Sequence, residues 1–448
     1  MKPASRSPAG ARARRALLAA LLGLGASAST PAQSLLELYE ASHGFDATYL
    51  SARSLAESIP YRVEQTEALN RLSASLTTSA VTLATNPPLF PSYSSEAYSL
   101  GLNLRRPLFN RSNDAAIEQA EKSLDVSRAD LDTAEQDLIL RLAQAYFEVL
   151  GAHDTLATTR ANKAAISEQL ASAKRNFEVG TATITDTREA QARFDLATAQ
   201  EIAAENDLVT RRIALDQLVG RPNIEPRPLA VPVILPALVP GSAEAWVSQA
   251  EEQHPAIRRA RSALDIAKLE TEKAKAAALP TVDAIAGATV ARGALGGQLG
   301  STAGTNYVSS VGVQLNMPLY SGGAIQNRVK ETLVLEDRSR NELDAARRTV
   351  SQAVRQAFYT LASVAAQVRA LEAAESSSQL ALEATQLGYR VGVRVNLDVL
   401  NAQNQLYQTR RDLARARYDV LVGNLRLRQA AGLVTPADVA SIDGLLAR

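Results

Sequence analysis

The sequence predicts a mainly α-helical protein with membrane-length β-strands, built from two tandem repeats of one long helical hairpin. The repeat rests on two similar stretches, residues 177–191 and 389–403, which align position by position with an offset of 212 residues. Composition supports long helices, because Ala, Leu, Gln, Glu and Arg dominate long segments and aromatic residues make up only 4%. Each half also contains two segments of alternating hydrophobicity, which is typical of strands.

Residues 1–32 are expected to be a secretory signal peptide. Five basic residues precede the apolar stretch 16–26, which is too short to span a bilayer and is followed by small residues. Without these five residues the chain has 43 basic and 47 acidic residues, and it shows no basic patch of the kind that binds nucleic acid. The chain has no cysteine, which excludes disulfides, thiolate metal sites and a lipid-bearing cysteine.

The first repeat is expected over residues 33–236. Its start reads as helical, with breaks near Gly44 and Pro60. Two strands are then predicted at about 72–84 and 97–109, the second of which alternates cleanly between apolar and polar residues.

The strands of the first repeat lead into a helical hairpin over about 111–220. Apolar residues recur every third or fourth position along 131–156, which is the spacing of a coiled coil. The pair Val179-Gly180 interrupts this pattern and predicts the turn of the hairpin. Six prolines in residues 221–241 predict a non-helical linker between the repeats.

The second repeat, 237–448, is expected to follow the same order. Strands are predicted at about 280–292 and 306–320, and a second helical hairpin at about 322–432. Between Leu343 and Leu371 the apolar positions average 3.5 residues apart, which again indicates a coiled coil.

Four strands per chain cannot close a membrane barrel, since closure with a filled interior needs about eight strands. Open sheet edges in a bilayer would leave backbone groups unpaired, at a cost of several kcal/mol each. The strands are therefore expected to pair with copies from other chains, and three chains would supply twelve strands. The helices would continue the barrel as a hollow cylinder. The alternative is a soluble helical protein with β-hairpins packed on its surface.

The sequence resembles the TolC family of outer-membrane efflux and secretion channels. The resemblance covers nearly the whole chain after the signal peptide, and its most specific motif is Gly388-Tyr389-x-Val391-Gly392-x-Arg394-x-x-x-Asp398-Val399-Leu400. It implies a homotrimer in the cell outer membrane, with a twelve-stranded β-barrel continued by an α-helical barrel in the periplasm. It also implies two partners besides membrane lipid: a periplasmic adaptor protein and an inner-membrane pump of the RND, ABC or MFS type.

The resemblance further implies a gate at the periplasmic entrance. Its members would be Asp186 on the first turn and Tyr389 and Arg394 on the second, linked by hydrogen bonds and ion pairs. The family also places two acidic residues, three apart, inside the tunnel; here the first is Asp398 but the second position is Asn401, which leaves three carboxylates per trimer rather than six. The alternative is that these are solvated tip residues, with Asp398 favoured at a helix start.

The two hairpin tips are expected to contact the adaptor. By resemblance the contacting residues are Val179, Gly180, Thr181, Val391, Gly392 and Val393. The glycines also have a simpler explanation, because a tight turn often needs a residue with positive φ.

The predicted function is that of a passive exit duct for drugs, small molecules or proteins. The sequence offers no set of catalytic residues, no cofactor-binding motif and no metal-ligand spacing, so an enzyme is not expected. The remaining alternative is a structural coiled-coil envelope protein without channel activity, which would have no need of membrane-length strands.

Overall fold

The computed structural model describes residues 32–85, 93–230, 232–233, 235–236, 238–293 and 304–447. The expected signal peptide, apart from its last position, lies outside these residues. The described part is mostly helical with one four-stranded sheet, as the sequence predicts. Its elements, in chain order, are α2 (Leu35–His43), α3 (Ala47–Glu67), the 3-10 turn η1 (Ala68–Asn70), β1 (Ser73–Thr85), β2 (Tyr93–Phe109), α4 (Arg111–Glu178), α5 (Ile184–Val219), α6 (Ala243–Gln253), α7 (Pro255–Ala276), β3 (Thr281–Gly293), β4 (Thr305–Asn316), α8 (Ala324–Arg390), α9 (Asn396–Ala430) and α10 (Pro436–Asp443).

The two halves of the chain build the same set of elements twice. Two strands, a long helix and a shorter helix follow one another in each half, and the long helices α4 and α8 have 68 and 67 residues. The shorter partners α5 and α9 have 36 and 35 residues. At 1.5 Å per residue, α4 alone extends over about 100 Å. The matched lengths confirm the tandem repeat.

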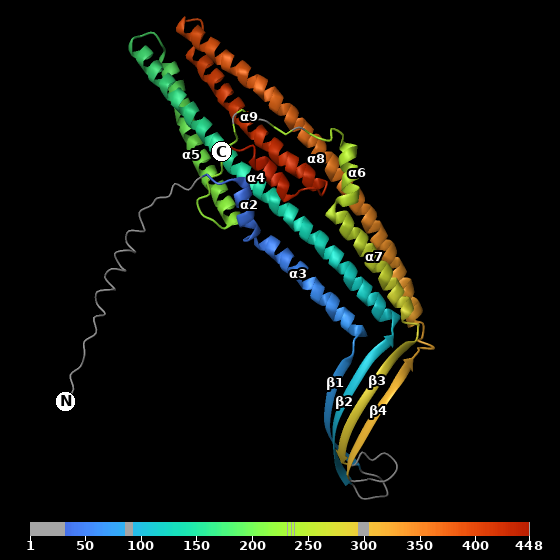
Figure 1. The fold of residues 1–448 in the computed structure, drawn as a ribbon. Helices are drawn as coiled ribbons and strands as arrows, with labels where there is room; N and C mark the ends of the chain where they lie inside the picture. The colour runs from blue at the N-terminus through green and yellow to red at the C-terminus, as the bar shows by residue number, and fades with distance from the viewer. Residues whose placement is uncertain are drawn as a thin grey trace, which may run out of the picture.

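The helices form a single layer of four columns (Figure 1). α3 and α5 pack along one side of α4, and α7 and α9 pack along its other side. α8 packs against α7 and α9 and forms the far column. Because α4 and α8 run the full length of the layer, each connects the sheet at one end of the molecule with a helical turn at the other end (Figure 1).

Coiled-coil periodicity explains why these helices are so long. α4 buries Leu142, Val149 and Leu156, which are seven residues apart, and α8 buries Leu361 and Val368 with the same spacing. A repeat of seven keeps one apolar stripe facing the neighbouring helix over many turns. In the part of the chain that the structure describes, none of the helices has an apolar run long enough to cross a bilayer.

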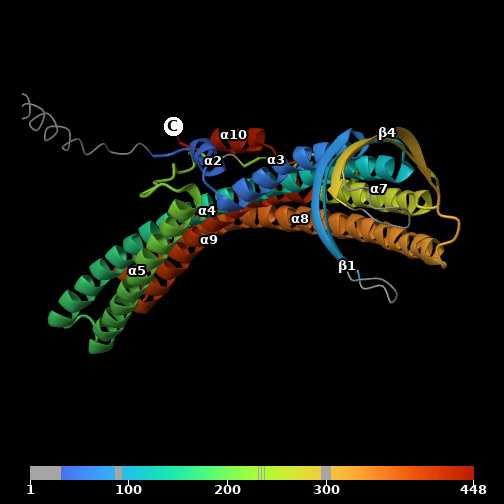
Figure 2. The same cartoon turned by 90° about the horizontal axis from the view of Figure 1, so that it is seen from below.

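The sheet is antiparallel, with the strand order β1-β2-β3-β4. Its central pair, β2 and β3, comes from different repeats, so the sheet joins the two halves of the chain. The register shifts between Pro107 and Phe109, where proline has no N–H to give to the ladder. Figure 2 shows that the sheet is curved into an open arc, with β1 and β4 at its two edges.

The two faces of the sheet differ in chemistry. On one face β1 presents Ser75 and Thr77, which lie opposite Asn103 and Gly101 of β2. The other face is apolar and exposed, and its members are Leu76, Tyr98, Leu100, Leu102, Val290, Tyr307, Val311, Val313 and Leu315. A sheet with one apolar exposed face and one polar face fits a wall between lipid and a water-filled lumen.

The apolar core lies near the middle of the helical layer, where α2 and α10 pack on one side of it (Figure 2). Tyr146 of α4 is fully buried there, and its hydroxyl lies 3.2 and 3.0 Å from the carbonyl oxygens of Gln33 and Arg227. The linker between the repeats is thereby held against α4. On the α8 side, Trp246 of α6 is buried and donates to the carbonyl oxygen of Pro240 at 2.9 Å.

Three sequence expectations need correction. α3 is not broken at Pro60; the proline is exposed and removes one backbone hydrogen bond, while buried Tyr49 and Ile59 hold the helix in place. β4 ends at Asn316 rather than near 320, because Pro318 cannot continue the ladder. The C-terminal helix α10 was not predicted, although its start carries a proline and a capping box in which Asp438 accepts from the backbone N–H of Thr435.

Candidate functional site

The two helical turns at the far end of the molecule have nearly the same backbone. Gly180 and Gly392 both have φ of +78°, a left-handed conformation that glycine adopts without strain. In each turn the glycine N–H bonds to a carbonyl three residues earlier, at 3.0 and 3.1 Å. The turns therefore need glycine at these positions for purely local reasons.

Both turns expose apolar side chains to an unusual degree. Val179 and Val393 are 72% and 78% exposed, although valine is normally buried. Phe177, Ile184, Leu387, Val391 and Val395 are also exposed around the two turns. Apolar side chains gathered at the tips of two neighbouring hairpins are typical of a protein-binding surface.

The predicted gate residue Asp186 lies in the first turn of α5, where it forms a capping box with Thr183. Its Oδ2 accepts from the Thr183 backbone N–H at 3.0 Å and from the Thr183 hydroxyl at 2.8 Å. In return the Thr183 hydroxyl oxygen accepts from the Asp186 N–H at 3.2 Å. Within one chain this carboxylate therefore stabilises the start of α5.

The other predicted gate residues lie on the second tip. The hydroxyl of Tyr389, in the last turn of α8, accepts from Nδ2 of Asn176 on α4 at 3.2 Å. Arg394 lies in the turn and pairs with Asp398 in the first turn of α9 at 3.6 Å. The structure thus links Tyr389 to the first hairpin through Asn176 rather than through Asp186.

Amide side chains make further hydrogen bonds between the two hairpins, beside the apolar packing of Leu400 of α9 against Ile166 and Leu170 of α4. Asn396, buried at the start of α9, accepts from Nε2 of Gln169 on α4. Asn401 is exposed, and its Oδ1 accepts from the guanidinium of Arg193 on α5 at 3.2 Å. The position where the sequence lacks a second acid therefore carries a link between the hairpins.

Sequence reasoning missed the α4 partners Asn162, Gln169 and Asn176. They are spaced by seven residues, so they share one face of α4, and the contacts of Gln169 and Asn176 point this face at the second hairpin. An amide at every seventh position of an apolar pattern was the signal that could have revealed them.

Nearer the middle of the layer, a groove of about 1010 Å³ opens between α4, α5, α8 and α9. Its lining includes Phe147 and Tyr418, whose rings stack with centroids 5.7 Å apart. Arg211, which also lines the groove, pairs with Glu148 at 2.7 Å and with Asp207 at 3.3 Å. The lining of the groove is therefore mixed, because apolar residues such as Leu361 and Val364 also belong to it.

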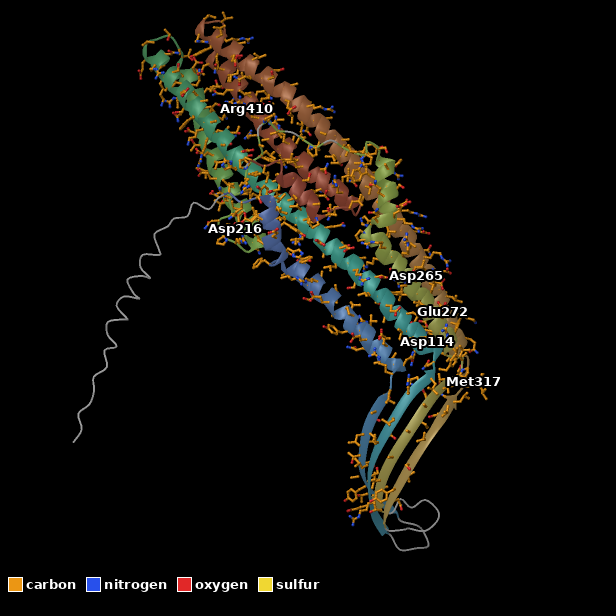
Figure 3. All side chains as sticks on the ribbon, in the orientation of Figure 1. Asp114, Asp216, Asp265, Glu272, Met317 and Arg410 are labelled. Carbon is orange, nitrogen blue, oxygen red and sulfur yellow. The ribbon has the colours of Figure 1, made fainter. Side chains whose placement is uncertain are left out.

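Between the groove and the tips, one arginine connects α9 to α8 through an ion pair and a hydrogen bond. Arg410 of α9, labelled in Figure 3, donates to Glu375 at 3.0 Å and to Gln379 at 3.1 Å. These bonds stabilise the packing of α8 against α9 within the second hairpin. Met317, also labelled, marks the opposite region, where the sheet meets the helices.

The two outer columns of the helical layer each carry a stripe of exposed, uncharged residues at coiled-coil spacing. We name these the edge seams. The α8 edge seam is Tyr359, Ser363, Ala366, Ala370, Ala373, Ser377, Leu380, Ala384 and Leu387. The α5 edge seam is Ala192, Leu196, Ala199, Ala203, Asn206, Thr210 and Ile213.

Each edge seam faces away from the helix to which its own column is packed. On α8 the seam residue Ala366 lies two positions before buried Val368, which is about 200° around the helix. On α5 the seam residue Ala199 lies two positions after buried Ala197. A second coiled-coil stripe on a helix that already has a partner indicates a further helix on that side.

Comparisons with known proteins agree with this architecture. The chain matches the outer membrane efflux protein family over residues 64–221 and 246–433. It is 34% identical to the outer membrane protein TolC of Vibrio cholerae, over 78% of this chain and 80% of that protein. It is 33% identical to the alkaline protease secretion protein AprF of Pseudomonas aeruginosa, over 77% and 71%. The crystal structure of the outer membrane protein VceC from Vibrio cholerae superposes with a TM-score of 0.75, at 19% identity, over 89% of this chain and 96% of that one.

Proposed function

Because this chain belongs to the outer membrane efflux protein family, we propose that three copies of it assemble into one continuous export duct. The chain is an outer-membrane channel protein for efflux or secretion, and its helical part extends into the periplasm. The trimer, the gate and the partners are the parts of the proposal that go beyond this.

The main evidence for the proposed trimer is the four-stranded sheet. It has four strands, two edges and one exposed apolar face. In a bilayer the edge N–H and C=O groups of β1 and β4 need partners, since lipid offers none. Pairing β4 of one copy with β1 of the next satisfies both edges at once. Three copies give a closed barrel of twelve strands, with the apolar face toward lipid.

The edge seams support the same assembly. In a ring of copies, the α8 edge seam of one chain faces the α5 edge seam of the next. Both stripes are uncharged and rich in small residues, so two helices can approach closely there. The helical columns would then continue the barrel as a closed tube.

At the periplasmic end we propose that Asp186, Tyr389 and Arg394 keep the duct narrow at rest. Asp186 uses Oδ2 in its capping box, which leaves Oδ1 free to accept from Arg394 of a neighbouring copy. Tyr389 ties the two hairpins of one chain together through Asn176. Exposed ion pairs contribute only about 0–1 kcal/mol each, so such a gate depends on threefold repetition.

The exposed apolar residues of the tips are proposed to bind a periplasmic adaptor. Val179, Gly180, Thr181, Val391, Gly392 and Val393 surround the two matched turns, and an adaptor would connect them to an inner-membrane pump of the RND, ABC or MFS type. Both kinds of cargo are proposed because one relative is named for the secretion of a protease and another for efflux. Deleting the gene and measuring drug sensitivity beside secreted proteins would identify the cargo.

Channel activity is tested with the purified mature protein in planar bilayers. We expect discrete conductance steps, and a heat-modifiable trimer in outer-membrane fractions. A structural coiled-coil protein of the envelope would give neither result. Insertion without conductance, at all applied voltages, would contradict the duct.

The gate is tested with the double variant Tyr389→Phe with Arg394→Ser. Loss of both links is expected to raise single-channel conductance severalfold. Arg390→Ser is the matched control, because it removes a neighbouring positive charge that lies outside the motif. Equal conductance of the double variant and the control would mean that these residues do not close the duct.

A further inference from the structure

The polar face of the sheet has very little charge. Its positions alternate with those of the apolar face along each strand, and most of them hold uncharged residues, such as Thr77, Thr289 and Ser310. Within the strands that the structure describes, Arg105 of β2 and Asp283 of β3 are the only charged residues on this face. These two residues therefore determine the electrostatic character of the surface.

The register of the sheet brings the two charged residues together. Arg105 lies opposite Ile285, and Asp283 is two positions from Ile285, so both side chains project from the same face as diagonal neighbours. Nη2 of Arg105 donates to Oδ2 of Asp283 at 2.7 Å. The pair lies at the end of the sheet that adjoins the helices, the region that Met317 marks in Figure 3.

The two partners differ greatly in exposure. The side chain of Asp283 is 7% exposed, whereas that of Arg105 is 59% exposed. Oδ1 of Asp283 is buried and has no hydrogen-bond partner among the residues that the structure describes. A buried carboxylate of this kind depends on its one guanidinium, because an unpaired buried charge is strongly destabilising. Arg105 is therefore held in place, with much of its side chain exposed.

An ion pair with one exposed and one buried partner has no net charge, but it does not present a neutral surface. Water and ions beside the sheet meet the guanidinium of Arg105, while the carboxylate of Asp283 is covered. The polar face therefore has a positive potential at this end of the sheet. In a trimer the same feature occurs three times at one level of the wall.

We propose that Arg105, positioned by Asp283, forms a ring at the base of the barrel that attracts the oxyanion groups of cargo, such as phosphate and carboxylate. A guanidinium suits both groups, because it can donate two parallel hydrogen bonds to either. Asp283 is a positioning residue, since it acts through Arg105. The inference rests on the proposed duct, in which the polar face lines the lumen. The barrel end of the duct is then positive, and the narrow end, with Asp398, is negative.

A thiol placed beside Arg105 measures this potential. The natural chain has no cysteine, and Asn103→Cys adds one on the same face and strand, two residues and about 7 Å from Arg105. The probes are two thiol reagents of similar size and opposite charge, the anionic sulfonatoethyl and the cationic trimethylammonioethyl methanethiosulfonates. The protein is reconstituted in lipid vesicles at about 0.1 M salt, where charges act over about 10 Å. The ratio of the two reaction rates gives the sign of the local potential.

We expect the double variant Arg105→Gln with Asp283→Asn to lower the ratio of anionic to cationic rates about tenfold. This variant leaves the net charge of the chain unchanged, so total charge cannot explain the effect. Asp283→Asn alone should raise the ratio, because the exposed cation then lacks its counter-charge, and Arg105→Lys should preserve the ratio. An equal ratio in the natural background and the double variant would overturn the proposal and leave the pair as a structural clamp.

Two controls make the measurement local. Arg106→Gln removes the adjacent arginine, which lies opposite Ala284 on the other face, and should leave the ratio unchanged. The thiol from Ser99→Cys lies on the polar face of the same strand, six residues and about 20 Å from Arg105, and should not respond to the double variant. A response in either control as large as that beside Arg105 would contradict a local field.

Failure of the duct and failure of the ring are distinguishable. Conductance of the natural protein in planar bilayers tests the duct, and the rate ratio tests the ring whether or not the gate opens. A conducting protein with an unchanged ratio refutes the ring alone, whereas a protein without conductance refutes the duct. If the double variant does not fold, as judged by circular dichroism, Asp283→Asn decides the question, because an unchanged ratio in that variant also contradicts the ring.

Discussion

At the residue scale, Asp398 and Asn401 are the two residues that we propose set the charge at the narrow end of the duct. Asp398 lies in the first turn of α9, where a negative charge is favoured by the helix dipole. Asn401 follows three residues later on an exposed face and binds Arg193. In a trimer this arrangement gives three carboxylates, each already close to Arg394.

We predict that Asp398→Asn lowers cation selectivity and weakens block by trivalent cations by roughly tenfold, while the trimer stays intact. Asn401→Asp should strengthen the block, because it rebuilds a ring of six carboxylates. Reversal potentials and block titrations in planar bilayers measure both effects. If both variants behave like the natural protein, Asp398 serves only to start its helix.

Asp46 is a second residue whose charge is tied to its position, here at the start of α3. Its burial would raise the pKa of its carboxyl group, but hydrogen bonds from Arg141 and from the Tyr49 N–H outweigh this and hold the pKa below its usual value. Because the pKa is lower in the folded protein than in the unfolded chain, the ionised carboxylate stabilises the fold at pH values above the unfolded pKa of about 3.9. That contribution disappears as the pH falls through the folded pKa.

Asp46→Asn should therefore lower the stability at pH 7 by about 1–2 kcal/mol, and the difference from the natural protein should shrink below about pH 4. Thermal unfolding at a fixed scan rate across this pH range measures it. Asp137→Asn is the control, because Asp137 is exposed and makes a longer contact, at 3.9 Å, with the same Arg141. Because asparagine also caps a helix well, a difference that stays constant at all pH values would show that the charge of Asp46 does not contribute.

Some residue roles could be predicted from the sequence, and others could not. The sequence Thr183-x-x-Asp186 is a readable capping box, which is how the structure uses it. By contrast, nothing in the sequence pairs Tyr389 with Asn176, because that contact depends on how two distant hairpins pack. A link between two residues 213 positions apart follows from tertiary geometry and not from local pattern.

At the scale of elements, the junction of α6 with α7 depends on a histidine. His254 precedes Pro255 and caps α7, because its Nδ1 accepts from the Ala256 N–H at 3.1 Å. Burial lowers the pKa of His254, and the nearby charge of Arg258 lowers it further. The neutral ring is thus the stabilising form, and its contribution is complete above the unfolded pKa of about 6.5.

As the pH falls from 7 to 5, the natural protein should lose more stability than His254→Asn. Asparagine keeps a good helix cap but does not titrate in this range. Thermal midpoints measured at both pH values test this, with His153→Asn at an exposed position of α4 as the control. Parallel pH profiles for the natural protein and His254→Asn would contradict the role of the histidine.

The boundaries of elements were largely predictable, since alternation and coiled-coil spacing are local properties. The strand expected at 72–84 runs over Ser73–Thr85, and the hairpin expected at 111–220 starts at Arg111. The failure at Pro60 has a different origin: local propensity favours a break, and packing along α4 overrides it.

For the whole molecule, periodicity alone does not say which apolar stripe meets which helix. The edge seams repeat every 3.5 residues, just like the stripes buried inside one chain. Only the structure shows that they lie on outward faces. The sequence therefore predicted coiled coils and a closed barrel, but not the order of the four helical columns.

A charge in an edge seam should break the assembly without unfolding the chain. We predict that Ala366→Glu shifts the detergent-solubilised protein from trimer to monomer, because three buried carboxylates would lack partners. Light scattering measures the mass, and circular dichroism checks the helices. Gln367→Glu, which adds the same charge next to the seam, should remain trimeric. A fully trimeric Ala366→Glu would exclude the seam from the interface.

The matched lengths of α4 with α8 and of α5 with α9 restrict how this protein can change in length. Its two tips are level only because the two repeats contain helices of nearly equal size. An insertion in one helix would lift one tip out of register with its neighbour, and an insertion whose size is not a multiple of seven would also rotate the apolar stripe off its partner. A longer form of this protein would therefore need matched insertions in α4, α5, α8 and α9 together, in multiples of seven.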